Sequence, residues 1–174
     1  SDAWSTSPLY RTRLCGPKEE DKHKLCIPYD VEASWQTWLL KAHRNKVETL
    51  VEQEPRVYLT ITNLKNEVII AGDPDGCQRI INALDCHALL IPFDSVIHNP
   101  LARAEYETFV NLYTHPVVTR PDCRFYSAAT YSPLVLEDKA LAHAVADMCC
   151  QSVTFPRLVN TVAYPSSTAQ KTST

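Results

Sequence analysis

The chain has 174 residues, of which 45% are hydrophobic and 21% are charged. This balance is typical of one ordinary globular domain, or of one compact body with a subdomain. The formal net charge of −3 gives no global basic field and argues against a nucleic acid partner. No apolar stretch approaches the roughly 20 residues that a membrane span needs, so we expect no span.

Residues 1–34 show little periodicity, because Pro8, Gly16, Pro17 and Pro28 interrupt them. The charged run from Lys18 to Lys24 predicts a solvated loop. We therefore expect residues 1–34 to form a linker or an extended arm laid on a larger body. The first residues carry neither the basic start nor the apolar core of a signal peptide.

Clear patterns begin at Trp35. The aromatic and apolar run Trp35–Ala42 predicts a strand, and Asn45–Gln53 predicts a helix with Asn45 as its N-cap. Val57–Thr62 predicts a strand with Val57, Leu59 and Ile61 on one face. Asn63–Asn66 predicts a turn into a second strand, Glu67–Gly72, so these two strands form a hairpin.

A second helix is predicted after Gly72, with Asp73 as its cap and Pro74 in its first turn. Cys86–Phe93 predicts the next strand. The order over residues 35–94 is thus strand, helix, strand, strand, helix, strand. This βαββαβ order predicts an α+β fold with a ferredoxin-like subdomain, in which two helices cover one face of an antiparallel sheet. Such a scaffold proves no function.

Further elements follow residue 95. Leu101–Thr114 predicts a helix and Arg124–Thr130 a strand. Glu137–Cys150 predicts a helix with Leu141, Val145 and Met148 on its buried face, and Arg157–Val162 a short helix. These pieces complete no sheet by themselves and need a further body to pack on. The last ten residues, 165–174, are polar and predict a disordered tail.

The seven cysteines indicate reduced thiols and a cytoplasmic protein, since their number is odd and no secretory signal is visible. No C-x-x-C pair occurs, and Cys86 and His87 are adjacent rather than spaced for tetrahedral ligation. We therefore expect no metal site.

His98 is the most informative candidate residue, because it follows an apolar run, Ala88–Phe93, that reads as a strand. A serine nucleophile in a G-x-S-x-G turn needs flanking glycines. The chain has only Gly16, Gly72 and Gly76, and no serine has one of them two residues before it and another two residues after it. The sequence therefore predicts part of a catalytic unit whose nucleophile lies elsewhere. The simpler alternative for His98 is a loop histidine satisfied by the backbone.

Three stretches in this order resemble a known family: Val57–Asn63 followed by Glu67–Asp73, Ser95–Ala102 around His98, and Gln151–Phe155. The segment from Trp4 to Gly16 resembles the lead-in of the same family. Together they are similar to the second half of a malonyl/acyl-carrier-protein transacylase domain, of the type found in polyunsaturated fatty acid synthases and polyketide synthases. Ser152 stands where the family usually has a proline.

The resemblance implies an activity. In the family, a serine takes an acyl group from coenzyme A and passes it to the phosphopantetheine thiol of an acyl carrier protein, and the histidine matched by His98 activates that serine. An imidazole titrates in the range that such a base needs. Asn99 or a backbone carbonyl is expected to orient its ring. The serine and the malonyl-binding arginine of the family both precede the matched region, and neither is in the chain.

Four further residues are candidates for substrate binding. Ile97 occupies the position that tracks with acyl choice in the family, and Asn99 follows the histidine. Arg103 lies one helical turn further on, where it meets a phosphate or carboxylate or else forms a surface salt bridge. Asn63 either faces the cleft or serves the hairpin turn.

These observations predict four regions: an arm over 1–34, a ferredoxin-like small subdomain over 35–94, the C-terminal part of an α/β-hydrolase-like large subdomain over 95–164, and the tail. The expected partners are acyl-CoA, an acyl carrier protein and the remainder of the synthase polypeptide, with no bound cofactor. Alone, the chain is expected to be inactive, because base and nucleophile act as a unit. The alternative is a non-catalytic ferredoxin-like docking module for a carrier protein or a sister subunit.

Overall fold

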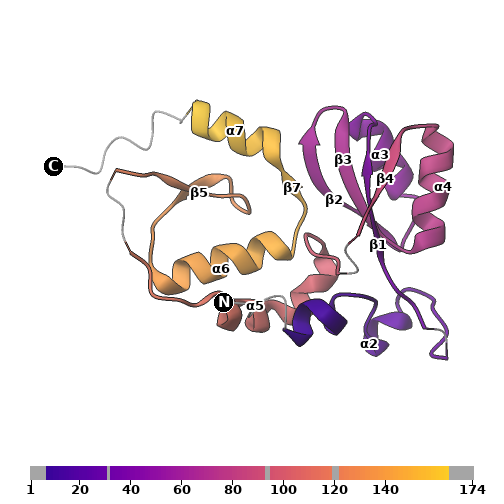
Figure 1. The fold of residues 1–174 in the computed structure, drawn as a ribbon, viewed down its shortest axis with the longest axis horizontal. Coiled ribbons are helices and arrows are strands. Elements are labelled where there is room, and N and C mark those ends of the chain that lie inside the picture. Colours follow the sequence, from indigo (N-terminus) through magenta and orange to yellow (C-terminus); the bar gives the residue numbers. More distant parts are fainter. Residues whose placement is uncertain (1–6, 31, 93–94, 119–121, 165–174) are drawn as a thin grey trace.

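The computed structural model describes residues 7–30, 32–92, 95–118 and 122–164. Two lobes lie side by side, and the N-terminal segment runs along one edge of both (Figure 1). We call residues 36–91 the sheet lobe and residues 100–163 the helical lobe. The predicted tail, 165–174, lies outside the described residues. In the described part of the chain, no helix has both the length and the apolarity to cross a bilayer.

The sheet lobe has the order of elements that the sequence predicts. The elements are β1 (Gln36–Leu40), α3 (Arg44–Val51), β2 (Val57–Leu64), β3 (Glu67–Gly72), α4 (Pro74–Leu84) and β4 (Ala88–Ile91). The strands lie in the order β4-β1-β3-β2 and are antiparallel, and a short strand β7 (Val153–Thr154) joins β2 in parallel. The result is an α+β fold with a mixed sheet, and β7 ties the sheet to the helical lobe.

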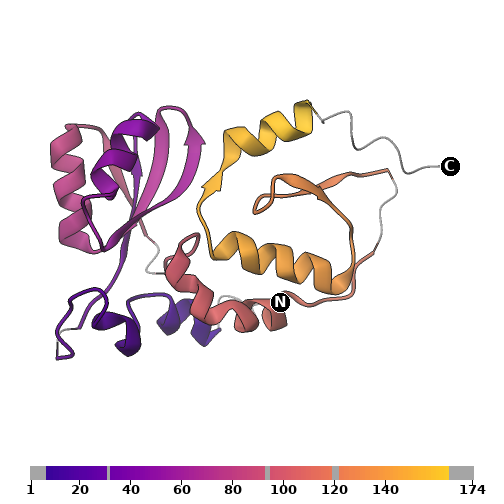
Figure 2. The same cartoon turned by 180° about the vertical axis from the view of Figure 1, so that it is seen from behind.

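Both α3 and α4 cover the same face of the sheet (Figure 2). Alternate strand residues point toward them, and Leu40, Val68 and Ile70 pack with Val47 of α3 and Ile80 of α4. A strand exposes alternate residues to opposite faces, so the other face carries the residues between these. That second face is the one that contributes to the candidate site.

The expected single face of Val57, Leu59 and Ile61 is wrong. A register shift between Leu59 and Ile61 puts Ile61 opposite Ile69, whereas Leu59 is opposite Ile70. The extra residue, Thr60, is buried and its hydroxyl donates a hydrogen bond to the carbonyl oxygen of Ile69 at 3.1 Å. This bulge moves Ile61 to the second face, because one inserted residue reverses the alternation.

The sequence correctly predicts the first residue and the cap of α4 but not those of α3. α4 begins at Pro74 as expected, and the Asp73 carboxylate caps it by accepting from the Gly76 amide at 2.9 Å. The predicted Asn45 cap of α3 is wrong, since that helix begins at Arg44 and the imidazole of His43 is its cap. The predicted turn at Asn63–Asn66 is shorter, because β2 continues to Leu64.

In two places the helical lobe has other elements than the sequence predicts. The expected helix Leu101–Thr114 is a 3₁₀ helix, η2 (Pro100–Glu105), followed by α5 (Tyr106–Tyr113). The expected strand at residues 124–130 is a hairpin of two short strands, β5 (Phe125–Ser127) and β6 (Ser132–Leu134). The chain then forms α6 (Asp138–Cys149), β7 and α7 (Phe155–Ala163).

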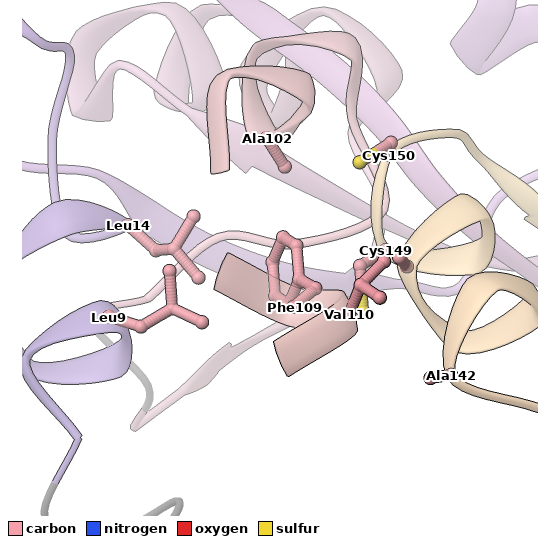
Figure 3. Close-up of a cluster of buried hydrophobic side chains, with 9 residues drawn as sticks. Leu9, Leu14, Ala102, Phe109, Val110, Ala142, Cys149 and Cys150 are labelled. Carbon is pink, nitrogen blue, oxygen red and sulfur yellow. The ribbon is translucent and has the colours of Figure 1, made fainter. Parts of the chain in front are cut away.

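The buried face of α6 consists of Ala142, Ala146 and Cys149. Leu141, Val145 and Met148, which the sequence predicts to be buried, are half-buried beside this face. Small side chains let α6 approach α5 closely, and Phe109 of α5 fills the space between them (Figure 3).

The N-terminal segment is part of the core. It forms a π-helical turn η1 (Leu9–Arg13) and a short helix α2 (Glu19–Lys22). Leu9 and Leu14 are buried against Phe109 (Figure 3). The expectation of a solvated loop at Lys18–Lys24 is therefore wrong: Asp21 and Lys22 are buried, and the Lys22 ammonium donates to the Tyr29 carbonyl at 3.2 Å.

Candidate active site

His98 lies in the turn that joins β4 to η2, where the sheet lobe meets the helical lobe. Its φ of +63° is in the left-handed region, which is uncommon for a residue other than glycine. Two hydrogen bonds to the C-terminal end of α6 hold it there. Its backbone amide donates to the Cys149 carbonyl at 2.7 Å, and its Nδ1 lies 2.8 Å from the Met148 carbonyl oxygen.

These contacts fix the tautomer of the imidazole. A carbonyl oxygen only accepts hydrogen bonds, so Nδ1 carries the proton and Nε2 keeps its lone pair in the neutral ring. Every fully buried side-chain nitrogen or oxygen of the described residues has a hydrogen-bond partner. No hydrogen-bond partner of Nε2 is found among those residues, so Nε2 is not fully buried and remains free to accept a hydrogen bond.

The protonation state of His98 suits a base. Burial lowers the pKa of His98 below its ordinary value, and the hydrogen bond to the Met148 carbonyl only partly opposes that shift. The ring is therefore neutral near pH 7. A neutral imidazole with an oriented Nδ1–H and an open Nε2 is the arrangement of a general base.

His98 lines a cavity of about 300 Å³ on the second face of the sheet. The floor of this cavity comes from all four strands of the sheet lobe, through Thr37, Thr60, Ile61, Ile69, Ala71 and Ile91. The opposite wall comes from the His98 turn and from η1, through Ser95, Val96, Ile97, His98 and Tyr10. The site is thus a mostly apolar cavity with one imidazole in its wall.

Asn99 stabilises the turn that carries His98. Its side chain is buried, donates to the Val96 carbonyl at 3.1 Å, and accepts from the amides of Leu101 at 2.9 Å and Ala102 at 3.3 Å. These contacts cap η2 and close the turn on both sides of His98. The ring of His98 is oriented by a backbone carbonyl, one of the two possibilities that the sequence left open.

The other predicted site residues lie in different places. Ile97 lines the cavity with His98. Asn63 and Arg103 are not among the described residues that line it. The Asn63 amide donates to the Glu67 carboxylate at 3.1 Å, and Arg103 pairs with Asp147 at 3.3 Å above the Tyr106 ring.

The sequence did not single out Tyr10, Thr37 or the Met148 carbonyl. Thr37 and its neighbour Trp38 point to opposite faces of the sheet, because side chains alternate along a strand. Once the helices are known to cover the Trp38 face, Thr37 is predicted to lie on the face of the cavity. Tyr10 comes from a segment without periodicity. Its hydroxyl lies 2.6 Å from that of Tyr113, and burial, more than this contact, raises the pKa of Tyr10.

No protein-family model and no curated protein matches the sequence. Solved structures do match. The malonyl-CoA:acyl carrier protein transacylase of Helicobacter pylori matches 74% of this chain with a TM-score of 0.63 and 14% identity. The acyltransferase domain of the polyketide synthase PpsC of Mycobacterium tuberculosis matches 88% with a TM-score of 0.61 and 17% identity.

A third such structure is the acyltransferase domain of phenolphthiocerol/phthiocerol synthase A from Mycobacterium bovis (BCG), which matches 90% of the chain with a TM-score of 0.59 and 20% identity. At these identities the likeness shows a shared fold. The chain spans 43%, 45% and 55% of the lengths of these three structures. It therefore has the fold of about half of such a domain.

Proposed function

We propose that this chain is the C-terminal part of an acyltransferase domain. That domain would move acyl groups between coenzyme A and the phosphopantetheine thiol of an acyl carrier protein, in the synthesis of polyunsaturated fatty acids or polyketides. The observation that carries the proposal is His98, whose Nδ1 is held by the Met148 carbonyl while Nε2 stays open beside an apolar cavity. The similarity to transacylase folds supports the same assignment.

His98 would act on a serine supplied by the remainder of the polypeptide. Nε2 takes the serine proton as the hydroxyl oxygen attacks the acyl-CoA thioester, and it returns that proton to the departing coenzyme A sulfur. The acyl-serine is then attacked by the carrier-protein thiol, with the proton passing through Nε2 in the reverse sense. The Met148 carbonyl stabilises the imidazolium that forms in each step.

The subdomain assignment is part of the proposal. The βαββαβ order and the strand order β4-β1-β3-β2 support a ferredoxin-like small subdomain over residues 35–94. Residues 95–164 would then belong to the large subdomain that bears the serine, with residues 1–34 as an arm against both. We also propose a cytoplasmic location, since coenzyme A thioesters are the acyl donors.

This proposal gives different roles to the four candidate binding residues, Ile97, Asn99, Arg103 and Asn63. Ile97 is the candidate for acyl contact, because it lines the cavity. Asn99 would act through the His98 turn. Arg103 and Asn63 remain candidates for contact with the carrier protein or with coenzyme A outside the cavity. A purely docking role would not need an imidazole held by one nitrogen with the other left open.

The test is acyl transfer to the carrier protein by the full-length polypeptide that contains this chain. We expect His98→Ala to lower the rate by about 10²–10⁴-fold, the usual contribution of a general base. His87→Ala, an exposed histidine outside the cavity, is the matched control and should leave the rate unchanged. An unchanged rate in His98→Ala would overturn the proposal.

The chain alone gives a second test. Incubated with radiolabelled acyl-CoA, the isolated chain should acquire no covalent label, because it contains no serine in a suitable turn. Covalent labelling that is lost in His98→Ala would show that a nucleophile is present in the chain itself. The division of the active site between this chain and the rest of the polypeptide would then be wrong.

A further inference from the structure

The helix α7 turns its apolar face away from the rest of the chain. Four apolar residues recur along it at spacings of three and four and form one stripe, which we call the α7 stripe: Phe155, Leu158, Val159 and Val162. Three of these side chains are between 45% and 51% exposed, and that of Leu158 is half-buried. No residue of α7 is buried. In a complete domain such a stripe faces the core, so its partner surface lies outside the described residues.

The polar side of α7 is the side that contacts the chain. The guanidinium carbon of Arg157 lies 4.2 Å from the centroid of the Tyr131 ring. The hydroxyl of Tyr131 accepts from the amide of Thr154, directly before the helix, at 2.8 Å. Arg157 is two residues from both Phe155 and Val159, so it projects from the other side of the helix. These contacts fix the orientation of α7 and hold the α7 stripe outward.

The two helices of the sheet lobe provide the comparison. α3 and α4 are described in full, and none of their large hydrophobic side chains is exposed. Val47 of α3 and Ile80 of α4 pack on the strands. The helical lobe, by contrast, also exposes Phe125 of β5 and Val135 beyond β6. Single exposed apolar residues are normal, but a continuous stripe with others on the same lobe marks an interaction surface.

We propose that the α7 stripe docks on the remainder of the acyltransferase polypeptide, the part that would bear the serine. The inference rests on the proposed function and adds to it the surface through which the two parts join. Length supports this occupant, because the chain spans only 43–55% of the lengths of the three structures that share its fold. The stripe carries no charge and no hydrogen-bonding side chain, so the matching surface of the partner is apolar as well.

A second copy of the chain is a poorer occupant. From Phe155 to Val162 the stripe rises about 10 Å along the helix. A stable interface between two proteins buries about 800 Å² on each partner, and two such short stripes placed face to face do not reach that area. The missing half of a domain can cover the stripe together with Phe125 and Val135.

The α7 stripe is connected to the candidate active site along the chain. The end of α6 supplies the two carbonyls that hold His98. In β7, Val153 pairs with Ile61, which lines the cavity, and α7 follows at once from Phe155 (Figure 1). One short run of chain thus holds the histidine, pairs with the floor of the cavity and carries the docking stripe. A part seated on α7 is therefore placed relative to Nε2 of His98.

Thiol alkylation at engineered cysteines measures whether the stripe is covered. Val159→Cys places a thiol on the α7 stripe. Asn160→Cys is the matched control, since Asn160 is exposed and lies on the other side of the same helix. Each variant is treated with N-ethylmaleimide as the isolated chain and as the full-length polypeptide that contains it. Mass spectrometry of the α7 peptide reads the engineered thiol separately from the native cysteines.

The two positions should respond differently. We expect Val159→Cys to react at least about tenfold more slowly in the full-length polypeptide than in the isolated chain, because burial makes a thiol unreactive. Asn160→Cys should react at rates within about twofold of each other in the two proteins. Equal rates for Val159→Cys would overturn the proposal. Slow reaction in the isolated chain that becomes fast on dilution would assign the stripe to a second copy and overturn it as well.

A charge substitution tests the same surface through stability. Val162→Glu should leave the unfolding temperature of the isolated chain unchanged, since the side chain is exposed there. In the full-length polypeptide the same change buries an unpaired carboxylate and should lower that temperature by at least about 4 °C. A full-length polypeptide unaffected by Val162→Glu would contradict a covered stripe. Neither experiment measures acyl transfer, and the rate loss in His98→Ala does not involve α7, so this inference and the proposed function fail separately.

Discussion

Nδ1 of His98 lies 2.8 Å from the carbonyl oxygen of Met148, fifty residues further along the chain. The neighbouring carbonyl, that of Cys149, accepts from the backbone amide of His98 at 2.7 Å. Two consecutive carbonyls at the end of α6 thus hold both the backbone and the ring of one residue. This pair of contacts stabilises His98 at its φ of +63° and engages Nδ1, so that Nε2 is the nitrogen left to accept a proton.

The first prediction concerns the titration of His98. Burial lowers its pKa below the ordinary value, so the imidazole should titrate at a lower pH than a histidine in a short unstructured peptide. The measurement is a pH titration of the histidine ring signals by NMR, assigned with His98→Gln. A titration of His98 at or above the pH of that peptide histidine would contradict the buried, backbone-held ring.

The same shift makes stability depend on pH. Between the folded and the unfolded pKa of His98, the unfolded chain binds more protons than the folded one, so stability rises as pH increases through this window. His98→Gln removes this contribution. We expect the stability difference between the wild type and His98→Gln to change in favour of the wild type from about pH 5 to about pH 7. Urea unfolding at a series of pH values measures it.

The second prediction concerns Met148, whose contribution to His98 comes from its backbone. Met148→Leu keeps the helix and the carbonyl, so the pKa of His98 and the acyl-transfer rate should both remain unchanged. Leucine and methionine have similar helix propensities and volumes, and such exchanges usually cost less than about 1.5 kcal/mol. A large change in the His98 titration would show that the thioether, and not the carbonyl, governs the ring.

Much of the sheet lobe was predictable from local patterns. The start of α4 follows from Asp73 and Pro74 alone, because capping and φ preferences act within one turn. The strands β1 and β3 follow from runs of apolar residues. The bulge at Thr60 was not predictable, since nothing in Val57–Thr62 marks where a residue is inserted, and it changes the face of Ile61.

The site was predictable only in part. His98 stands out by its position after a strand, and Ile97 follows as its neighbour. The Met148 partner leaves no signal in the sequence, because any residue at position 148 offers the same carbonyl. The role of the N-terminal segment was missed for a related reason: Leu9 and Leu14 become buried by contacts with Phe109, about a hundred residues away in sequence, and not by a local period.

The third prediction concerns Asn99. Asn99→Ala removes the cap of η2 and leaves the Val96 carbonyl without its donor, so we expect a loss of about 1–3 kcal/mol in the free energy of unfolding. Asn99→Asp keeps the accepting oxygen and should recover part of it. The control is Asn63→Ala, whose side chain has one contact at the end of a hairpin. Equal losses for Asn99→Ala and Asn63→Ala would contradict the role given to Asn99.

The fourth prediction concerns Gly72, at the end of β3. Its φ is +148°, and a Cβ atom there would lie 2.1 Å from the Arg56 carbonyl oxygen. A backbone atom cannot move aside as a flexible side chain can, so Gly72→Ala should destabilise the sheet lobe by more than about 2 kcal/mol. Thermal unfolding followed by circular dichroism measures this loss, and a variant as stable as the wild type would contradict the close approach.

The last prediction concerns Glu105, which links the N-terminal segment to the His98 turn. Its carboxylate is buried, pairs with Arg13 at 3.2 Å and with Lys18, and accepts from the Thr108 hydroxyl at 2.9 Å. Burial alone would raise the pKa of Glu105, but the hydrogen bonds from Lys18, Thr108 and Arg13 outweigh it and lower the pKa. The ionised form is therefore the one that the fold stabilises.

Glu105→Gln keeps the shape and removes the charge, so we expect a loss of about 1–3 kcal/mol near neutral pH, the range for hydrogen bonds to a charged group. Because the folded pKa is depressed, this advantage of the wild type is present above the unfolded pKa and is lost as the pH falls through the folded pKa. Urea unfolding of both proteins near pH 7 and at a series of pH values descending below the ordinary carboxyl pKa follows the loss of this advantage. Glu48→Gln, which disrupts the more exposed pair with Arg44, is the control and should cost less than about 0.5 kcal/mol. A Glu105→Gln loss that did not shrink toward low pH would mean that packing, and not the charge, joins this segment to the turn of His98.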